Sequence, residues 1–132
     1  MRRLIWLLAT FWVSQAQAET LDWAEFEADA QQTLVDLIRL DTSQPEGNEY
    51  LAANYLKQRL DAAGIASTIY EAAPGRASIV ARIKGNGSKR PLLLLGHTDV
   101  VTVERANWTF DPFSGTVKDG KIFGRGAADD KG

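Results

Sequence analysis

The sequence lacks cysteine altogether among its 132 residues. This absence excludes disulfide bonds, thiolate nucleophiles and cysteine-ligated metal sites. It has one histidine, His97, so a site that needs two imidazoles cannot be assembled within this sequence. It also lacks an excess of positive charge, since its formal net charge is −2. Phosphate-backbone binding depends on clustered lysine and arginine, so we expect no nucleic-acid partner.

The first 18 residues predict a secretory signal peptide. Arg2 and Arg3 precede an apolar run of 10 residues, Leu4 to Val13, and a small-x-small motif then ends at Ala18. The run is about half of the ~20 residues that a membrane-spanning helix requires. Cleavage after Ala18 would remove two arginines and no acid, change the formal charge from −2 to −4, and leave no stable membrane span. We therefore expect an exported, periplasmic or secreted protein, with an uncleaved anchor as the alternative.

Two helices are predicted after the signal peptide. The first, Trp23 to Leu40, has apolar residues at steps of three and four and a candidate N-cap at Asp22. Its predicted apolar stripe is Trp23, Phe26, Ala30, Leu34, Leu37 and Ile38. A proline- and glycine-containing loop follows. Asn48 is expected to cap the second helix, Glu49 to Ala63.

Strand signals dominate the remainder. β-Branched residues predict strands over 65–70 and 77–83, and a tight turn is predicted over 85–88. Four consecutive leucines in 91–95 favour a strand covered on both faces, as in the centre of an α/β sheet. A second hairpin is predicted over 116–123, around an Asp-Gly pair. This order indicates an α/β fold, although two helices are few for a sheet covered on both faces.

His97 and Asp99 follow the leucine run, at the strand end where open α/β sheets place ligands. In extended backbone, residues two apart point to the same side. One ring nitrogen of His97 could bind a metal, while Asp99 could accept a hydrogen bond from the other and fix the tautomer. The alternative is a structural His–Asp pair at a strand end.

A second acidic element lies in the segment 124–132, which reads GRGAADDKG. Its glycines permit a sharp turn, and a carboxylate beside an imidazole suits Zn²⁺, Mn²⁺ or Co²⁺. The alternative is a surface loop with solvated acids. A phosphate-binding loop is excluded because the G-x-x-x-x-G-K-[ST] pattern is absent and two acids would repel phosphate.

Several motifs together resemble one enzyme family. GHTDVV at 96–101, WTFDPFSG at 108–115, and DGKIFGRGAADDKG at 119–132 occur in the order and spacing of zinc-dependent metallopeptidases and deacylases. That family includes acetylornithine deacetylases, succinyl-diaminopimelate desuccinylases, aminoacylases and glutamate carboxypeptidases. The loop DTSQPEGNE at 41–49 is similar to the family's N-terminal segment as well. The resemblance extends over about residues 34–132.

The resemblance implies a three-layer α/β/α catalytic domain with a mixed sheet, of which residues 19–132 would be the N-terminal portion. It implies that His97 is a zinc ligand and that Asp99, the candidate catalytic residue, is its hydrogen-bonded partner. Asp129 would bridge two zinc ions, for which cobalt or manganese could substitute. Asp130 stands at a variable motif position and is not expected to be a ligand, and Arg125 would shape the loop.

The implied reaction is hydrolysis of an amide bond in a peptide or an N-acyl amino acid. Paired metals would activate water and polarise the carbonyl, and a carboxylate would act as base. The family's glutamate pair, further acidic ligand, second histidine and dimerisation domain cannot be assigned in this sequence. We therefore expect an incomplete enzyme, whose homodimer contact would lie elsewhere. The alternatives are a non-catalytic binding or interaction module and an unrelated α/β domain with chance motifs.

Overall fold

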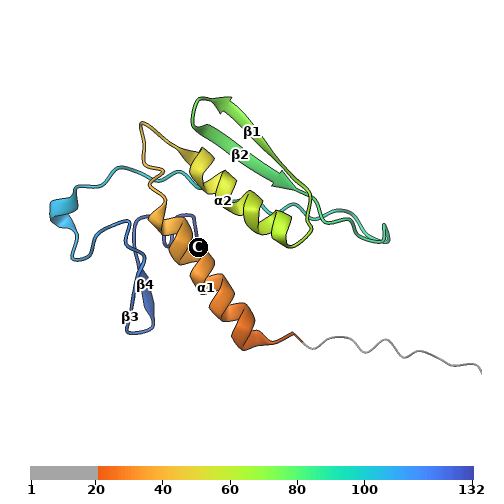
Figure 1. Ribbon diagram of the computed structural model, residues 1–132, viewed down its shortest axis with the longest axis horizontal. Helices are drawn as coiled ribbons and strands as arrows, with labels where there is room; N and C mark the ends of the chain where they lie inside the picture. The colour runs from red at the N-terminus through yellow and green to blue at the C-terminus, as the bar shows by residue number, and fades with distance from the viewer. Residues whose placement is uncertain (1–20) are drawn as a thin grey trace, which may run out of the picture.

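The computed structural model describes residues 21–132, so the predicted signal peptide and its cleavage site lie outside the described residues. Two helices precede two β-hairpins along the chain (Figure 1). The elements are α1 (Trp23–Arg39), α2 (Glu49–Ala62), β1 (Ser67–Ala73), β2 (Arg76–Ala81), the 3₁₀ helix η1 (Arg105–Asn107), β3 (Thr116–Lys118) and β4 (Lys121–Phe123). The predicted α/β class is confirmed. None of the helices in this part of the chain is both long and apolar enough to span a bilayer.

Helix α1 begins as the sequence predicts. The carboxylate of Asp22 accepts hydrogen bonds from the backbone N–H groups of Ala24 and Glu25, at 3.0 and 3.2 Å. These bonds satisfy two of the N–H groups that the first turn leaves free. The predicted apolar stripe is buried only towards the C-terminal end, since Trp23 and Phe26 are 64% and 52% exposed. Arg59 of α2 reaches Asp29 on the N-terminal half of this helix, but Trp23 and Phe26 there are left exposed. This half extends away from the core (Figure 1).

Helix α2 lies against the β1–β2 hairpin, and Ala52 and Ala53 are buried. Asn48 is the N-cap residue of α2, as predicted, but its side chain does not cap the helix. Asn48 occupies the N-cap position in the left-handed region, with φ of 62°, and its side chain makes no capping hydrogen bond. The turn between β1 and β2 takes part of that role, because the Gly75 carbonyl accepts a hydrogen bond from the Tyr50 N–H at 2.9 Å. A tertiary contact has replaced the local one.

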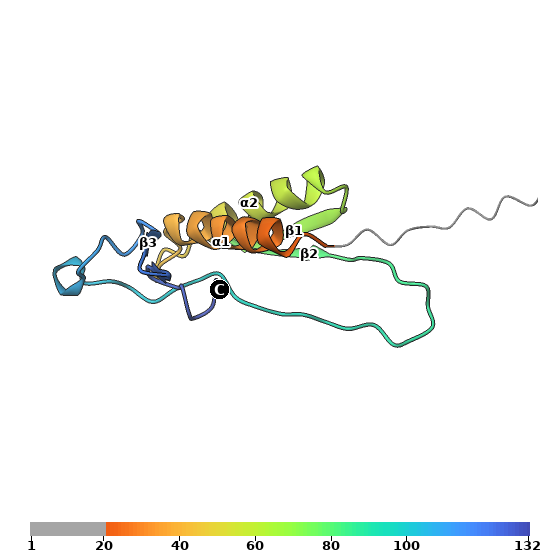
Figure 2. The ribbon, with the colours of Figure 1, turned by 90° about the horizontal axis from the view of Figure 1, so that it is seen from below.

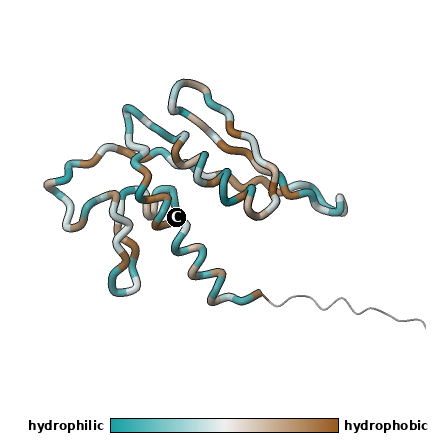
Figure 3. The backbone as a smooth tube through the Cα atoms, viewed as in Figure 1, coloured by the Kyte–Doolittle hydropathy of each residue, from teal (hydrophilic) through white to brown (hydrophobic). Residues whose placement is uncertain are grey.

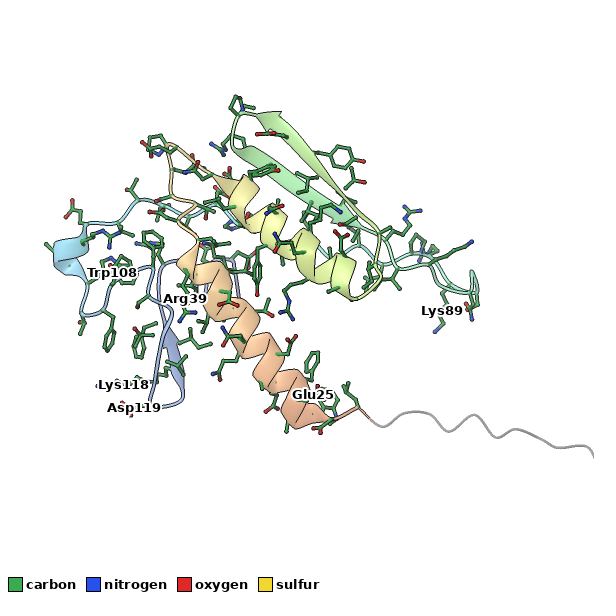
Figure 4. The ribbon with its side chains drawn as sticks, viewed as in Figure 1. Glu25, Arg39, Lys89, Trp108, Lys118 and Asp119 are labelled. Carbon is green, nitrogen blue, oxygen red and sulfur yellow. The ribbon has the colours of Figure 1, made fainter. Side chains whose placement is uncertain are left out.

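The strands predicted over 65–70 and 77–83 pair with each other, and the hairpin predicted over 116–123 is confirmed. β1 pairs antiparallel with β2, with Ile69 opposite Ile79, and β3 pairs antiparallel with β4. The turn of the second hairpin has positive φ at both central residues, Asp119 and Gly120, as a type I′ turn requires. Apolar residues occur along both hairpins (Figure 3), and Asp119 lies at the tip of the second (Figure 4).

The predicted buried strand over 91–95 is wrong for this structure. Residues 82–99 form an extended loop outside both sheets (Figure 2), with Lys89 near its tip (Figure 4). The predicted tight turn over 85–88 does not close a hairpin. The leucines at 92–95 are 81–91% exposed. A strand needs a neighbour to pair its N–H and C=O groups, and the described residues offer these leucines none. The predicted mixed sheet requires parallel pairing as well as antiparallel pairing. Among the described residues, parallel pairing is limited to a single bridge between Ser43 and Val100.

The core lies where the C-terminal half of α1 meets three loops. Ile38 and Pro112 are fully buried, and Val35 and Val100 are 4% and 3% exposed. Gly124 lies so close to this cluster that an added Cβ would stand 2.3 Å from the Cγ2 atom of Ile38. The core therefore fixes the start of the acidic segment 124–132 against α1.

Candidate metal centre

The segment carrying His97 and Asp99 is attached to the loop after α1. Val100 donates its N–H to the Thr42 carbonyl at 3.1 Å and accepts the N–H of Gln44 at 2.9 Å. The hydroxyl of Thr42, which is fully buried, donates to the Thr98 carbonyl. These bonds hold the backbone on both sides of Asp99, at the inner end of an otherwise unpaired loop.

The acidic segment is a compact turn tied to the same core. Gly126 has φ of 85°, and an added Cβ there would stand 2.8 Å from Val100 Cγ1, so glycine is required. The Arg125 N–H donates to the Pro112 carbonyl at 2.7 Å, and its guanidinium carbon lies 5.1 Å from the centre of the Trp108 ring. These contacts attach Arg125 to the loop backbone and to Trp108, and its role in shaping the loop stays a prediction.

Lys131 closes this turn onto α1. Its Nζ donates to the carbonyls of Leu37 and Leu40, at 2.9 and 2.7 Å, and the residue is 8% exposed. Carbonyls in the last turn of a helix have no partner within the helix, and a cation there is favoured by the helix dipole. The ammonium therefore anchors the segment two residues after Asp129.

The fold brings the three predicted site residues together. His97 Nε2 lies 3.0 Å from Asp129 Oδ1, although 32 residues separate them. His97 Nδ1 lies 3.1 Å from the backbone oxygen and 3.3 Å from the Oδ1 atom of Asp99. Asp130 Oδ2 accepts the backbone N–H of His97 at 3.3 Å and so faces the main chain rather than the imidazole. The site is open, since Asp129 is 89% and His97 53% exposed.

The contacts of His97 define its proton positions. The Asp99 backbone oxygen and the Asp129 carboxylate both only accept hydrogen bonds, so each favours a hydrogen on the ring nitrogen that it faces, and the doubly protonated ring satisfies both. The hydrogen bond to the Asp99 backbone raises the pKa of His97 above its usual 6.5, and the bond to Asp129 raises it further against the opposing effect of desolvation. The neighbouring acceptors therefore favour a proton on the ring. A metal ion could take the place of the proton between Nε2 and Asp129.

The donor set fits two ligands of one metal ion. Zinc–ligand bonds of about 2.0–2.2 Å at tetrahedral angles separate two ligand atoms by about 3.3–3.5 Å. The 3.0 Å separation between His97 Nε2 and Asp129 Oδ1 is a few tenths of an ångström shorter, so a small opening would admit the ion. Over residues 21–132, no three His, Cys, Asp or Glu side chains are grouped to hold a metal. A complete site needs at least three protein ligands, so these two are part of one.

Two hollows meet at this centre. One, of about 450 Å³, lies between α2, β2 and the segment ending at Asp99, and its lining includes Glu49, Arg76 and His97. The other, of about 240 Å³, lies over the acidic segment and includes Asp129 and Arg125. His97 and Asp99 line both hollows, so they stand between two spaces that a substrate or another part of the protein could occupy.

Burial of Lys131 predicts a pH dependence of stability. Desolvation lowers the pKa of Lys131 from 10.5 to about 8, against the attraction of Asp41. The unfolded chain therefore binds more protons than the folded chain between about pH 8 and pH 10.5. The free energy of unfolding should rise with pH across this window and lose this contribution as the pH falls through 8.

Chemical denaturation across that window measures the effect. Lys131→Met retains the apolar stem and removes the titrating amine, so its unfolding free energy should rise less between pH 8 and pH 10.5. Lys89→Met, on the exposed loop, serves as the matched control and should keep the slope of the original protein. Equal slopes in all three proteins would contradict the assignment.

Comparison with known proteins places these residues in a family. Residues 93–132 match the model of peptidase family M20/M25/M40. The chain is 47% identical over 103 residues to a probable succinyl-diaminopimelate desuccinylase of Staphylococcus aureus strain Mu50, covering 76% of this chain and 24% of that protein. A probable desuccinylase of the same name from Staphylococcus epidermidis strain RP62A is 41% identical over 108 residues, covering 80% and 25%. The succinyl-diaminopimelate desuccinylase of Dinoroseobacter shibae is 44% identical over 97 residues, covering 73% and 25%. The chain spans about a quarter of the length of these curated relatives.

Proposed function

We propose that this chain, whose predicted relationship to the peptidase M20 family is now confirmed, supplies part of the metal centre of an amide hydrolase. The observation that carries the proposal is the 3.0 Å approach of His97 Nε2 to Asp129 Oδ1, with Asp99 on the opposite side of the ring. In this proposal His97 and Asp129 are metal ligands, and Asp99 acts through His97. The metal that these two residues would hold is zinc, and cobalt or manganese could replace it.

Each residue has a separate task in this function. Asp99 holds the Nδ1 hydrogen, so that Nε2 presents its lone pair and His97 is a more basic ligand. Asp129 supplies hard carboxylate oxygen on the same side as Nε2. When bound, the metal would polarise the scissile carbonyl and lower the pKa of a water molecule. The general base and the remaining ligands are not assigned among the described residues.

The proposed substrate is an N-acyl amino acid or a short peptide. The relatives are named as desuccinylases of succinyl-diaminopimelate, so an N-succinyl amide of a diamino acid is the first compound to test. We also propose that the chain is exported, on the basis of the signal-peptide pattern at residues 1–18, and that the active protein forms a homodimer.

Chelation of the metal tests the function directly. The protein expressed from its complete reading frame should hydrolyse N-succinyl or N-acetyl amino acids or dipeptides. A chelator should abolish this activity, and added zinc or cobalt should restore it, because the metal would supply the activation of water. Activity that survives complete metal removal, or absence of hydrolysis with zinc present, would refute the proposal.

One observation favours a second candidate, a non-catalytic binding module. In the part of the chain that the structure describes, only two donors converge, fewer than a zinc site requires. A protein from the complete reading frame that folds but neither retains zinc nor hydrolyses amides would favour this module.

A further inference from the structure

The side chain of Gln44 connects Asp99 to an ion pair, Glu49 and Arg76, that also lines the larger hollow. Gln44 Nε2 lies 3.2 Å from Asp99 Oδ2 and 3.5 Å from Glu49 Oε1. Arg76 Nη1 donates to Gln44 Oε1 at 3.1 Å, and Arg76 Nε lies 2.8 Å from Glu49 Oε2. These four side chains, Glu49, Arg76, Gln44 and Asp99, form a continuous polar chain that ends at the partner of His97.

The chemistry of the neighbours fixes the orientation of the Gln44 amide. Arginine only donates hydrogen bonds, so the amide oxygen must face Arg76. Ionised carboxylates only accept, so the amide NH₂ must face Asp99 and Glu49. A flipped amide would place NH₂ against the guanidinium and oxygen against two carboxylates. One orientation is therefore satisfied throughout, and it donates to Asp99.

The far end of the polar chain is partly buried, with the Arg76 side chain 40% exposed. The Glu49 side chain is 8% exposed and is paired with Arg76 beneath the loop after α1. The Arg76 side chain packs against Gly47 and needs glycine there, because an added Cβ at Gly47 would stand 2.5 Å from Arg76 Cδ. Gln44 is also held through its backbone, whose N–H donates to the Val100 carbonyl. The amide that meets Asp99 is therefore fixed at both its main chain and its oxygen.

We propose that Gln44 is a positioning residue that holds the Asp99 carboxylate in place for His97. By engaging Oδ2, it leaves Oδ1 directed at His97 Nδ1, at 3.3 Å. Oδ1 then adds to the Asp99 backbone oxygen as an acceptor for a hydrogen on Nδ1, in competition with Asp129 at Nε2. The importance of this role for catalysis rests on the proposed function, whereas the contacts themselves do not.

The single histidine makes the proposal measurable without a metal. Protein labelled with ¹⁵N-histidine gives the signals of His97 alone, and their shifts report which nitrogen of the neutral ring carries hydrogen. At a pH at which the ring is neutral, Asp99 at Nδ1 and Asp129 at Nε2 compete for one hydrogen, and the ratio of the two forms in the original protein is the reference. In Gln44→Glu, a carboxylate replaces the donor facing Asp99, and the fraction of the Nδ1–H form should fall below that of the original protein. Gln58→Glu, the same substitution at an exposed position of α2, should leave the ratio unchanged.

A donor–acceptor exchange separates positioning from general damage to the fold. Asp99→Asn alone places an amide against the Gln44 amide and should also shift the tautomer. Combining Gln44→Glu with Asp99→Asn restores one donor and one acceptor across the 3.2 Å contact, and should recover most of the Nδ1–H form. A structural role for Gln44 without positioning predicts two additive losses and no recovery.

Zinc affinity provides a second readout, with the metal ion itself as the probe and the protein from the complete reading frame. Loss of an outer partner of a metal-ligating histidine typically weakens binding by about 10–100-fold, so the zinc affinity of Gln44→Glu should fall about tenfold and that of Gln58→Glu should not change measurably.

An unchanged tautomer ratio in folded Gln44→Glu and Gln44→Ala proteins would overturn the positioning role. If neither variant folds, Arg76→Gln serves instead, because it removes the guanidinium that donates to the Gln44 amide oxygen. An unchanged tautomer ratio in the Arg76→Gln protein would also overturn the positioning role. A shifted ratio without zinc binding in the original protein would support the positioning role and refute the proposed function.

Discussion

Replacing His97 with alanine should lower zinc affinity by more than about 100-fold and abolish amide hydrolysis. The reason is that His97 is the only imidazole in the chain, and its Nε2 atom is one of the two donors that converge. Loss of an outer partner alone typically weakens metal binding by about 10–100-fold, so loss of a ligand should exceed that range. The measurement is a competition titration with a chromogenic chelator, together with the hydrolase assay, on the protein from the complete reading frame.

A matched pair of acid-to-amide substitutions controls this result. Asp129→Asn keeps the shape of the second donor but removes its charge, and it should weaken zinc binding as well. Glu27→Gln makes the same chemical change on the exposed N-terminal half of α1, and it should bind zinc like the original protein. The assignment of His97 and Asp129 as ligands fails if the His97→Ala protein binds zinc as tightly as the original.

Replacing Gly124 with alanine should destabilise the fold by about 3 kcal/mol, because overpacking a close-packed core typically costs about 1–3 kcal/mol and sometimes more. The added Cβ would stand 2.3 Å from Ile38 Cγ2 and 3.1 Å from the Pro112 carbonyl oxygen. Ile38 is fully buried and β-branched, so it has no free rotamer into which to retreat. Denaturant unfolding followed by tryptophan fluorescence measures the loss.

Gly85→Ala is the control for this substitution. Nothing lies within 4 Å of an added Cβ at Gly85, and its φ is not in the left-handed region, so stability should change by less than about 1 kcal/mol. Gly124→Ala should also displace the segment that carries Asp129 and thereby weaken zinc binding. A Gly124→Ala protein as stable as Gly85→Ala would show that the packing between α1 and this segment is not formed in solution.

Local patterns predicted the elements whose interactions are local. Asp22 caps α1 through residues two and three positions away, and the Asp119-Gly120 pair closes a two-residue turn. The contact between His97 and Asp99 also follows from their separation of two residues. In each case the deciding hydrogen bond or dihedral angle belongs to residues that are neighbours in the chain.

Patterns that depend on a distant partner were predicted less well. The four leucines at 92–95 have the composition of a buried strand, but a strand forms only where another backbone pairs with it. The N-terminal stripe of α1 likewise has the spacing of a buried face without a covering element. Hydrophobic spacing states what a segment could bury, whereas burial itself requires a surface supplied by another part of the protein.

The sequence by itself determined the α/β class, the absence of thiol chemistry and the choice of His97, Asp99 and Asp129 as candidate site residues. Only the tertiary structure decided that His97 meets Asp129 across 32 residues, that Gln44 reaches Asp99 across 55, and that Lys131 binds the end of α1 across more than 90. No short-range pattern encodes these contacts, since a glutamine in a loop or a lysine after two aspartates is most often solvated. They form because packing around Ile38 and Val100 brings three loops to one place, and the polar groups there then pair with one another rather than with water.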